Sequence, residues 1–395
     1  MTLVFLLAGY AIANGYTLSQ IWYWASLGRS PLPARRIKMG TGILYGLLAL
    51  IPVLGAFLPN SLVQNWLTAA GNVWLGVYLY LTGLLLLAHG GRALYRLKKG
   101  QGQGPNQRMA TCVLAGIVAA SLAINGYGYY HARQIQQTAY QVTLEGDFAE
   151  SGSLRIVLLA DLHLGVNSDL DHIQNMVDQV KAAQPDLILV AGDHFTSTYA
   201  GLRNPEAYQS VLEQMTCSYG VYAVYGNHDT DETLFGGFAI TGVEEAYRDP
   251  DMTAFLQRCG WTLLDDQVAT VADGQIGLIG RRDANKPGDG TDQRASAQDL
   301  LAEAEKDRPC IVLEHEPVEL ETLGALGADL ILSGHTHQGQ LFPGNLITPL
   351  FNENNYGVKN LGTGISVVTS GVGYYGPPIR VGTNSEIVVL DVTWQ

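Results

Sequence analysis

Five short motifs in the second part of the chain carry the residue types that bind metal ions. They combine aspartate, asparagine, glutamate and histidine, and none contains cysteine. Oxygen and imidazole ligands without thiolate suit Mn²⁺, Fe²⁺/Fe³⁺ or Zn²⁺ rather than Ca²⁺. Any one of these histidines alone is more often structural than a ligand, but five motifs in series indicate a metal centre. The motifs are Asp161-Leu162-His163, Gly192-Asp193-His194, Gly226-Asn227-His228-Asp229, Glu314-His315-Glu316-Pro317 and Gly334-His335-Thr336-His337.

The spacing inside the motifs also fits metal binding. Asp161 and His163 are two residues apart, so both side chains point the same way on an extended strand end, and the last motif repeats this spacing. Two cations about 3.5–4 Å apart need a bridging carboxylate to lower their repulsion, and Asp193 is the candidate. Such a pair of ions activates water and orients a phosphate for in-line attack. The pattern therefore predicts a centre of two metal ions.

Each motif follows a short apolar run, which predicts that strands position the site. Between them, residues 170–183 have helical spacing, with Ile173, Val177 and Val180 on one face. Strands that alternate with helices predict an α/β layered fold, in which active sites collect at the carboxyl ends of the strands. The expected strands are Arg155–Ala160, Asp186–Ala191, Val221–Tyr225, Cys310–Leu313, Asp329–Leu332 and Glu386–Val392.

From Leu154 to Val392 the sequence resembles the calcineurin-like metallophosphoesterase superfamily. The resemblance rests on the specific motifs DLH, GD, GNHD, an H-E-P turn and GHTH. It implies a four-layer α-β-β-α sandwich and a hydrolase that uses two divalent metal ions, Mn, Fe or Zn. It is nearest to membrane-associated bacterial members, which include nucleotide-sugar-lipid pyrophosphatases. An envelope or lipid-linked phosphate is therefore the expected substrate class, with monoester, diester and pyrophosphate left open.

The resemblance also implies a role for each site residue. His228 would not bind metal but would face the substrate as general acid, and Asn227 could also hydrogen-bond a phosphate oxygen. Asp193 would bridge the two ions. Asp161, His163 and His337 would hold the first metal, and Asn227, His315 and His335 the second.

Four further side chains have two open interpretations. The family commonly has an apolar residue where His194 stands, and this histidine either lines the pocket or bonds a neighbouring loop. Arg380 either pairs with a substrate phosphate or forms a surface salt bridge. Arg281 and Arg282 follow a strand-like segment and raise the same question. His194 and Arg380 are the tentative substrate-binding residues.

The first third of the chain predicts a four-span membrane region. Four uncharged stretches of about 18–22 residues are each long enough to cross a hydrocarbon core. The first lacks the basic start and the cleavage site of a signal peptide, so we interpret it as a retained helix. The alternative is four buried helices of a soluble protein. The stretches are Leu3–Trp24, Thr41–Leu58, Trp66–Leu87 and Met109–Tyr130.

Charge predicts how these spans are oriented. Loops one and three hold Lys and Arg, whereas loop two has no charge, so the positive-inside rule places loops one and three in the cytoplasm. An even number of spans then places the catalytic domain on the extracytoplasmic side of the cell membrane. The expected organisation is transmembrane helices in residues 1–131, a polar linker in 132–153 and the metallophosphoesterase domain in 154–395.

Charge also separates the two parts of the chain and limits their partners. Residues 1–150 have ten Lys/Arg and three Asp/Glu, a balance of +7, whereas residues 151–395 have thirteen and thirty-three, a balance of −20. So acidic a domain is not expected to bind nucleic acid. The alternative to an enzyme is a non-catalytic phosphate-sensing module that is coupled to the helices. For the helices themselves three roles stay open: an anchor, a binding site for a lipid substrate, or a transporter. Oligomeric state stays open.

Overall fold

The computed structural model describes residues 2–58, 62–99, 105–235 and 238–395, and the chain forms two compact units. The helical unit contains residues 1–129 together with Leu234–Ile240 and Gly376–Pro378. The sandwich unit contains the remaining segments, Tyr130–Thr233, Thr241–Tyr375 and Ile379–Gln395. Each unit is described by itself.

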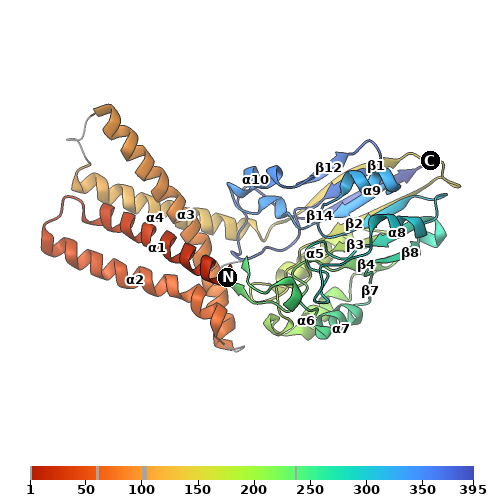
Figure 1. The fold of residues 1–395 in the computed structure, drawn as a ribbon, viewed down its shortest axis with the longest axis horizontal. Coiled ribbons are helices and arrows are strands. Elements are labelled where there is room, and N and C mark those ends of the chain that lie inside the picture. Colours follow the sequence, from red (N-terminus) through yellow and green to blue (C-terminus); the bar gives the residue numbers. More distant parts are fainter. Residues whose placement is uncertain (1, 59–61, 100–104, 236–237) are drawn as a thin grey trace. The chain divides into compact units, whose positions relative to one another are not determined.

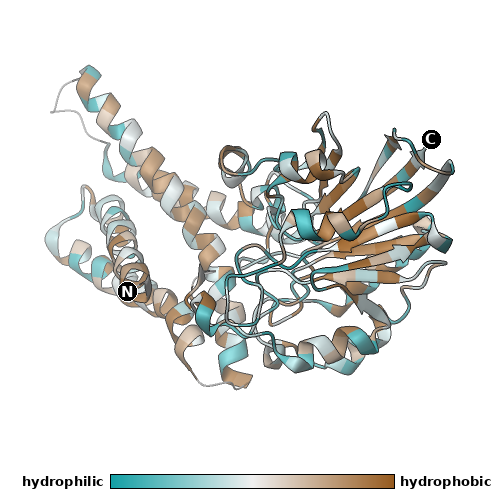
Figure 2. Cartoon of the chain, turned by 45° about the vertical axis from the view of Figure 1, so that its right-hand side comes forward, coloured by the Kyte–Doolittle hydropathy of each residue, from teal (hydrophilic) through white to brown (hydrophobic). Residues whose placement is uncertain are grey.

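The helical unit is built from four long helices that run through the predicted spans. Three of them, α2, α3 and α4, are long and apolar enough to cross a membrane, and hydrophobic residues run along their length (Figure 2). The helix α1 covers the first predicted span but is not among these three. The basic segments expected to be loops belong partly to helices, since α2 begins before Arg35 and α3 continues past Arg96. The helices are α1 (Thr2–Ser26), α2 (Pro31–Phe57), α3 (Leu62–Lys99) and α4 (Gln107–His131).

Neutral polar side chains join these helices inside the unit. The Tyr45 hydroxyl of α2 donates to Asn14 Oδ1 of α1 at 2.7 Å, and the hydroxyls of Thr17 and Thr82 lie 2.9 Å apart. Interhelical hydrogen bonds of this kind stabilise helices in an apolar environment, where an unpaired polar group is costly. The unit also includes a short hairpin of β5 (Leu234–Phe235) and β6 (Phe238–Ala239), and the Phe235 ring packs on Tyr10.

The sandwich unit contains two six-stranded sheets (Figure 1). The first has the order β1-β14-β2-β3-β4-β7, and the second has the order β12-β13-β11-β10-β9-β8. The strands of the first sheet are β1 (Ile135–Leu144), β2 (Gly152–Leu159), β3 (Leu187–Ala191), β4 (Val221–Val224), β7 (Trp261–Leu263) and β14 (Ser385–Trp394). Those of the second are β8 (Gln267–Val271), β9 (Ile276–Gly280), β10 (Cys310–Leu313), β11 (Leu330–Ser333), β12 (Gly357–Asn360) and β13 (Ile365–Val368).

Helices cover the outer face of each sheet, which gives the expected four layers. One apolar core lies between the first sheet and α5, α6 and α7, and a second core joins the two sheets. A third core lies between the second sheet and α8 and α9. The four-layer α-β-β-α architecture is therefore confirmed. The helices are α5 (Leu170–Ala183), α6 (Pro205–Leu212), α7 (Pro250–Arg258), α8 (Ala297–Glu303), α9 (Leu320–Leu326) and α10 (Gly344–Ile347).

Parallel pairing brings the ends of the central strands to one rim. In the first sheet β2 pairs with β3 and β3 with β4, all in parallel. In the second sheet β10 pairs in parallel with both β9 and β11. Because parallel strands end at the same edge of a sheet, the segments that follow them lie together. The five motifs therefore lie at one rim, three after strands of the first sheet and two after strands of the second.

The segment expected to be a polar linker, residues 132–153, contains a strand of the first sheet. Strand β1 pairs in parallel with β14 along ten residues, from Ile135 opposite Ser385 to Leu144 opposite Trp394. Only a few of its side chains, Ile135, Val142 and Leu144, are buried, because β1 is an edge strand whose other positions are mostly polar. The sandwich therefore begins earlier than residue 154.

Candidate metal centre

The structure gathers all seven predicted metal ligands at the carboxyl rim of the two sheets. The first sheet supplies Asp161 and His163 after β2, Asp193 after β3 and Asn227 after β4. The second sheet supplies His315 after β10, and His335 and His337 after β11. The ligand set is thus divided between the two sheets, and neither sheet could assemble it alone.

One group contains Asp161, His163 and His337. The Nε2 atoms of the two histidines are 2.9 Å apart, and His337 Nε2 lies 3.5 Å from Asp161 Oδ1. His163 Nε2 lies 4.0 Å from the same oxygen. Two ring nitrogens and a carboxylate oxygen therefore converge on one point, as the ligands of a single cation do.

A second group forms around Asn227. Its Oδ1 lies 3.1 Å from His315 Nε2 and 3.1 Å from His335 Nδ1. The other ring nitrogen of His315, Nδ1, donates to the Ala191 carbonyl at 2.7 Å. This hydrogen bond directs the lone pair of Nε2 towards the group, because the N–H must lie on Nδ1.

Asp193 lies between the two groups. Its Oδ2 is 3.7 Å from His163 Nε2 in the first group and 3.2 Å from His315 Nε2 in the second. Its Oδ1 accepts a hydrogen bond from the backbone N–H of His228 at 2.8 Å. This is the position that a bridging carboxylate needs.

The backbone at the rim is strained, which is typical of a functional site. Asp161, His163, Asp193, His335 and His337 all have a positive φ, between 47° and 70°. A non-glycine residue in this conformation costs on the order of 1–3 kcal/mol and persists only where the surroundings enforce it. The strained backbone therefore lowers the stability of the fold but orients these side chains towards the two groups of ligands.

Two glycines permit the close approach of the loops. A Cβ at Gly226 would lie 2.2 Å from Asp193 Oδ1, and a Cβ at Gly334 would lie 2.8 Å from Asp161 Oδ2. Any side chain at these positions would displace a carboxylate of the site. Glycine at both positions therefore lets the loops come close enough to place these carboxylates.

Burial shifts the pKa values of the ligands. It raises the pKa of Asp161 to about 7 and lowers that of His163 to about 3 and that of His335 to about 4. Burial would lower the pKa of His315, but Asp193 and the other carboxylates around it raise that pKa well above its usual range. Together the ligands form a donor set of nitrogen and oxygen atoms, without thiolate, that suits divalent cations of the Mn, Fe and Zn type. The residues present therefore fit two metal ions, which would neutralise the buried carboxylates.

His228 lies beside the two groups and is held by residues that the motifs did not reveal. Its Nδ1 hydrogen-bonds the fully buried carboxylate of Glu232, which in turn pairs with Lys286. The Tyr375 ring stacks on the imidazole with centroids 4.3 Å apart. Burial alone would lower the pKa of His228, but the carboxylates of Asp193 and Glu232 outweigh it and raise the pKa.

The two tentative substrate-binding residues are fully buried and bind the chain itself. His194 Nε2 lies 2.8 Å from the carbonyl of Val224, the last residue of β4, so its partner belongs to a strand and not to a loop. The Arg380 guanidinium donates to the carbonyls of Ser370 and Gly373 at 2.6 and 2.7 Å, and it contacts His337 Nδ1 at 3.3 Å. Both residues brace the loops of the site, and neither exposes a surface to a substrate.

The other two arginines also pair within the sandwich. Arg281 is buried and bonds Glu314 Oε2 and Glu319 Oε2, both at 2.8 Å. Arg282 pairs with Asp265 and Asp289. Their contacts favour a structural role.

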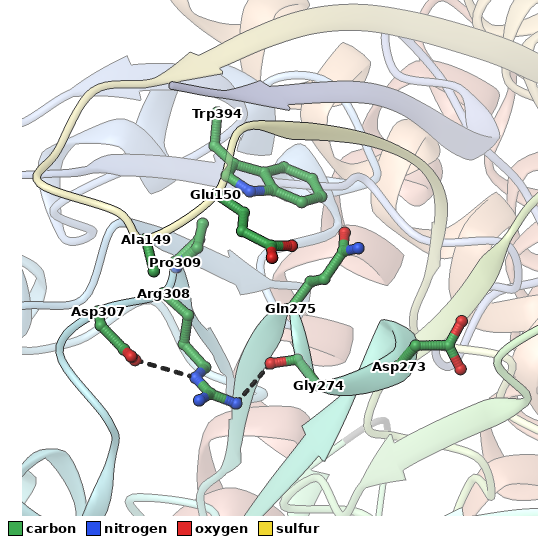
Figure 3. A pocket seen from close by; sticks show the side chains of 9 residues that line it. All are labelled: Ala149, Glu150, Asp273, Gly274, Gln275, Asp307, Arg308, Pro309 and Trp394. Atoms are coloured by element: carbon green, nitrogen blue, oxygen red, sulfur yellow. Dashed lines mark hydrogen bonds and ion pairs between the residues drawn. The ribbon is translucent and has the colours of Figure 1, made fainter.

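The opposite rim of the sandwich also has a cavity, of about 250 Å³ (Figure 3). The segments before β2, β9 and β10 line it, and its acidic residues, Glu150, Asp273 and Asp307, are exposed. Arg308 lies among them and donates to Asp307 Oδ1 at 3.2 Å and to the Gly274 carbonyl. Neither group of candidate metal ligands in the described part of the chain includes a residue of this rim.

Comparison with known proteins agrees with this site. The sequence profile described as calcineurin-like phosphoesterase matches residues 154–339. A "transmembrane protein with metallophosphoesterase domain" from Danio rerio is 30% identical over 82% of this chain and 73% of its own length. The protein of the same name from Bos taurus is 28% identical over 80% and 71%. An "uncharacterized metallophosphoesterase" from Helicobacter pylori is 30% identical over 60% of this chain and 59% of its own length.

Proposed function

We propose that this chain, which belongs to the calcineurin-like phosphoesterase family, hydrolyses a lipid-linked or envelope phosphate while anchored in a membrane. The family membership makes it a metallophosphoesterase, and the substrate class and the anchoring are the proposal. Hydrolysis is supported by the convergence of Asp161, His163 and His337, and of Asp161, Asp193 and His315, within 4.8 Å at one buried rim. The substrate class is inferred from the sequence resemblance, and the anchoring from three apolar helices.

We assign seven side chains to two divalent cations. Asp161, His163 and His337 would hold one, Asn227, His315 and His335 the other, and Asp193 would lie between them. When bound, the ions supply Lewis acidity and a nucleophile at neutral pH. The amide nitrogen of Asn227 is left to donate to a phosphate oxygen, because its Oδ1 faces the histidines.

His228 is the proposed general acid. The Glu232 carboxylate engages Nδ1, so the proton available to a leaving oxygen is the one on Nε2. Stacking on Tyr375 restricts the ring to one plane. A second, non-catalytic function would make His228 dispensable for ligand binding, and the experiment below separates the two.

The test is a substrate panel on the full-length protein in detergent, loaded with Mn²⁺. It compares a chromogenic monoester, a chromogenic diester and a lipid-linked pyrophosphate, each beside Asp193→Ala and His228→Ala variants. We expect turnover of one class that both variants lose. Binding of the phosphate analogue vanadate without turnover of any substrate would instead favour a sensing module.

Membrane anchoring rests on three apolar helices and on charge. The helices α2, α3 and α4 satisfy the length and composition of spans. Nine of the ten Lys/Arg before residue 150 lie at the α1–α2 and α3–α4 ends, and only Arg133 follows the other end of α4. We propose that α1 is a fourth span, which puts the sandwich on the extracytoplasmic side. A membrane-impermeant maleimide applied to intact cells should label Glu305→Cys, but not Arg35→Cys, in a background without the native cysteines. The reverse labelling would overturn this orientation.

A further inference from the structure

The helical unit has positive charge without any acidic partner of its own. The first acidic residue of the chain is Glu145, and the segments 234–240 and 376–378 contain none, so the unit holds nine Lys/Arg and no Asp or Glu. No Lys or Arg of the unit can therefore find a carboxylate within it, and the counter-charge must come from outside. The nine are Arg29, Arg35, Arg36, Lys38, Arg92, Arg96, Lys98, Lys99 and Arg108.

Two of these arginines line a hollow on α3. The hollow has a volume of about 520 Å³ and is lined by His89, Arg92, Ala93, Arg96 and Leu97. Positions 89, 92 and 96 are three and four residues apart, so their side chains share one face of the helix. The predicted span ends at Leu87, and α3 continues for about 18 Å beyond it at 1.5 Å per residue. The hollow therefore lies just past the end of the span.

Contacts with α1 hold two of the side chains that line the hollow, Arg92 and His89, in place. The Arg92 guanidinium lies over the Tyr23 ring, with Cζ 3.9 Å from the ring centroid. The hydroxyl of Tyr16 lies 3.1 Å from His89 Nδ1. Arg92 is half-buried, whereas Arg96 is exposed. Side chains that are held before a ligand arrives lose less entropy when they bind it, so the hollow is partly preorganised.

We propose that this hollow binds the phosphate headgroup of an anionic phospholipid. Arg92 and Arg96 present planar forks of donors that match a phosphodiester, and Leu97, which also lines the hollow, is exposed for contact with an acyl chain. A basic cluster next to a span is attracted to an anionic leaflet. The proposal rests on the membrane insertion of α3 but not on hydrolysis, and the proposed orientation places this lipid on the face opposite the catalytic domain.

The test measures lipid binding to the full-length protein in neutral detergent. Native mass spectrometry would give the apparent affinity for phosphatidylglycerol and for phosphatidylcholine. The Arg92→Gln/Arg96→Gln pair is compared with Arg35→Gln/Arg36→Gln, which removes the same charge from exposed positions at the start of α2. We expect the first pair to lower the affinity for phosphatidylglycerol at least tenfold and the second less than twofold.

Three results would overturn the proposal. Equal losses in both pairs would show diffuse attraction to charge, and equal affinity for the two lipids would show that no anionic headgroup is recognised. Competition by millimolar inorganic phosphate would show a site for free phosphate. If the double variant fails to fold, Arg96→Gln alone gives the test, since this exposed side chain has no packed ring partner in the described structure. Hydrolysis of a soluble substrate, measured in parallel, should stay unchanged, so failure here leaves the proposed function standing.

Discussion

At the carboxyl rim of the sandwich Asp161 and Asp193 are buried among imidazoles, whereas at the opposite rim Glu150, Asp273 and Asp307 are exposed. The exposed acids can be solvated by water, and Asp307 has an arginine partner. The buried acids have lost contact with water. An isolated buried carboxylate is costly, so it needs a proton or a cation. A cluster of acidic side chains alone therefore does not indicate a metal centre; the side chains must also be buried and lie close to other ligand atoms.

Removing one acid from each rim tests this comparison with the largest expected effect. Asp193→Asn removes the proposed bridging charge, so we expect hydrolysis to fall on the order of 10³-fold and bound metal to fall with it. The matched change at the other rim, Asp307→Asn, should alter activity less than twofold. Turnover assays and metal analysis check both. Comparable losses in the two variants would contradict the distinction between the rims.

A smaller effect is expected where a buried carboxylate acts through another side chain. Glu232→Gln weakens the bond to His228 Nδ1, and we expect kcat to fall about 10–100-fold with little change in KM. Bound metal should stay constant, since Glu232 belongs to neither ligand group. Steady-state kinetics and metal analysis check this. Loss of metal together with kcat would mean that Glu232 supports the centre itself.

Replacing an arginine at each of the two rims should change the free energy of unfolding by different amounts. Arg380→Met leaves the carbonyls of Ser370 and Gly373 without their donor, so we expect a loss of about 2–4 kcal/mol in the free energy of unfolding. Arg308→Met at the opposite rim should cost less than about 1 kcal/mol, because its acidic partners are exposed. Denaturant unfolding of the full-length protein measures both. Equal costs would show that burial does not separate the two.

The pH dependence of metal affinity follows from Asp161. Its folded pKa is raised to about 7, so below that pH the carboxyl holds a proton that a cation must displace. We expect the apparent affinity for Mn²⁺ to fall as pH falls through 7, with this carboxyl alone contributing up to about tenfold per pH unit below it. Calorimetry of the metal-free protein between pH 5.5 and 8.5 checks this. An affinity that does not fall below pH 7 would rule out proton competition at this carboxyl.

The sequence predicted the local parts of this account well and the long-range parts less well. The helix at residues 170–183 and the strand at residues 310–313 have their predicted bounds, because apolar residues at helical spacing define the first and a continuous apolar run defines the second. Strand β1 was missed because most of its side chains are polar and its burial depends on β14.

The same limit applies to the site. The structure brings the predicted ligands together, but their assignment to metals stays a prediction. Glu232 stands four residues after His228, a spacing that could have been noticed, whereas Lys286 and Tyr375 come from distant loops. The sequence left Arg380 open between a substrate phosphate and a surface salt bridge, whereas its burial, which only the fold reveals, places its guanidinium against backbone carbonyls.

We propose that the carboxyl rim of the sandwich holds two cations with Asp193 between them. Electron paramagnetic resonance of the full-length protein loaded with Mn²⁺ tests it most directly, because two ions about 3.5–4 Å apart couple magnetically. We expect two ions per chain and a spin-coupled signal that Asp193→Asn abolishes. A wild-type protein that shows only isolated Mn²⁺, or a coupled signal that survives Asp193→Asn unchanged, would contradict it.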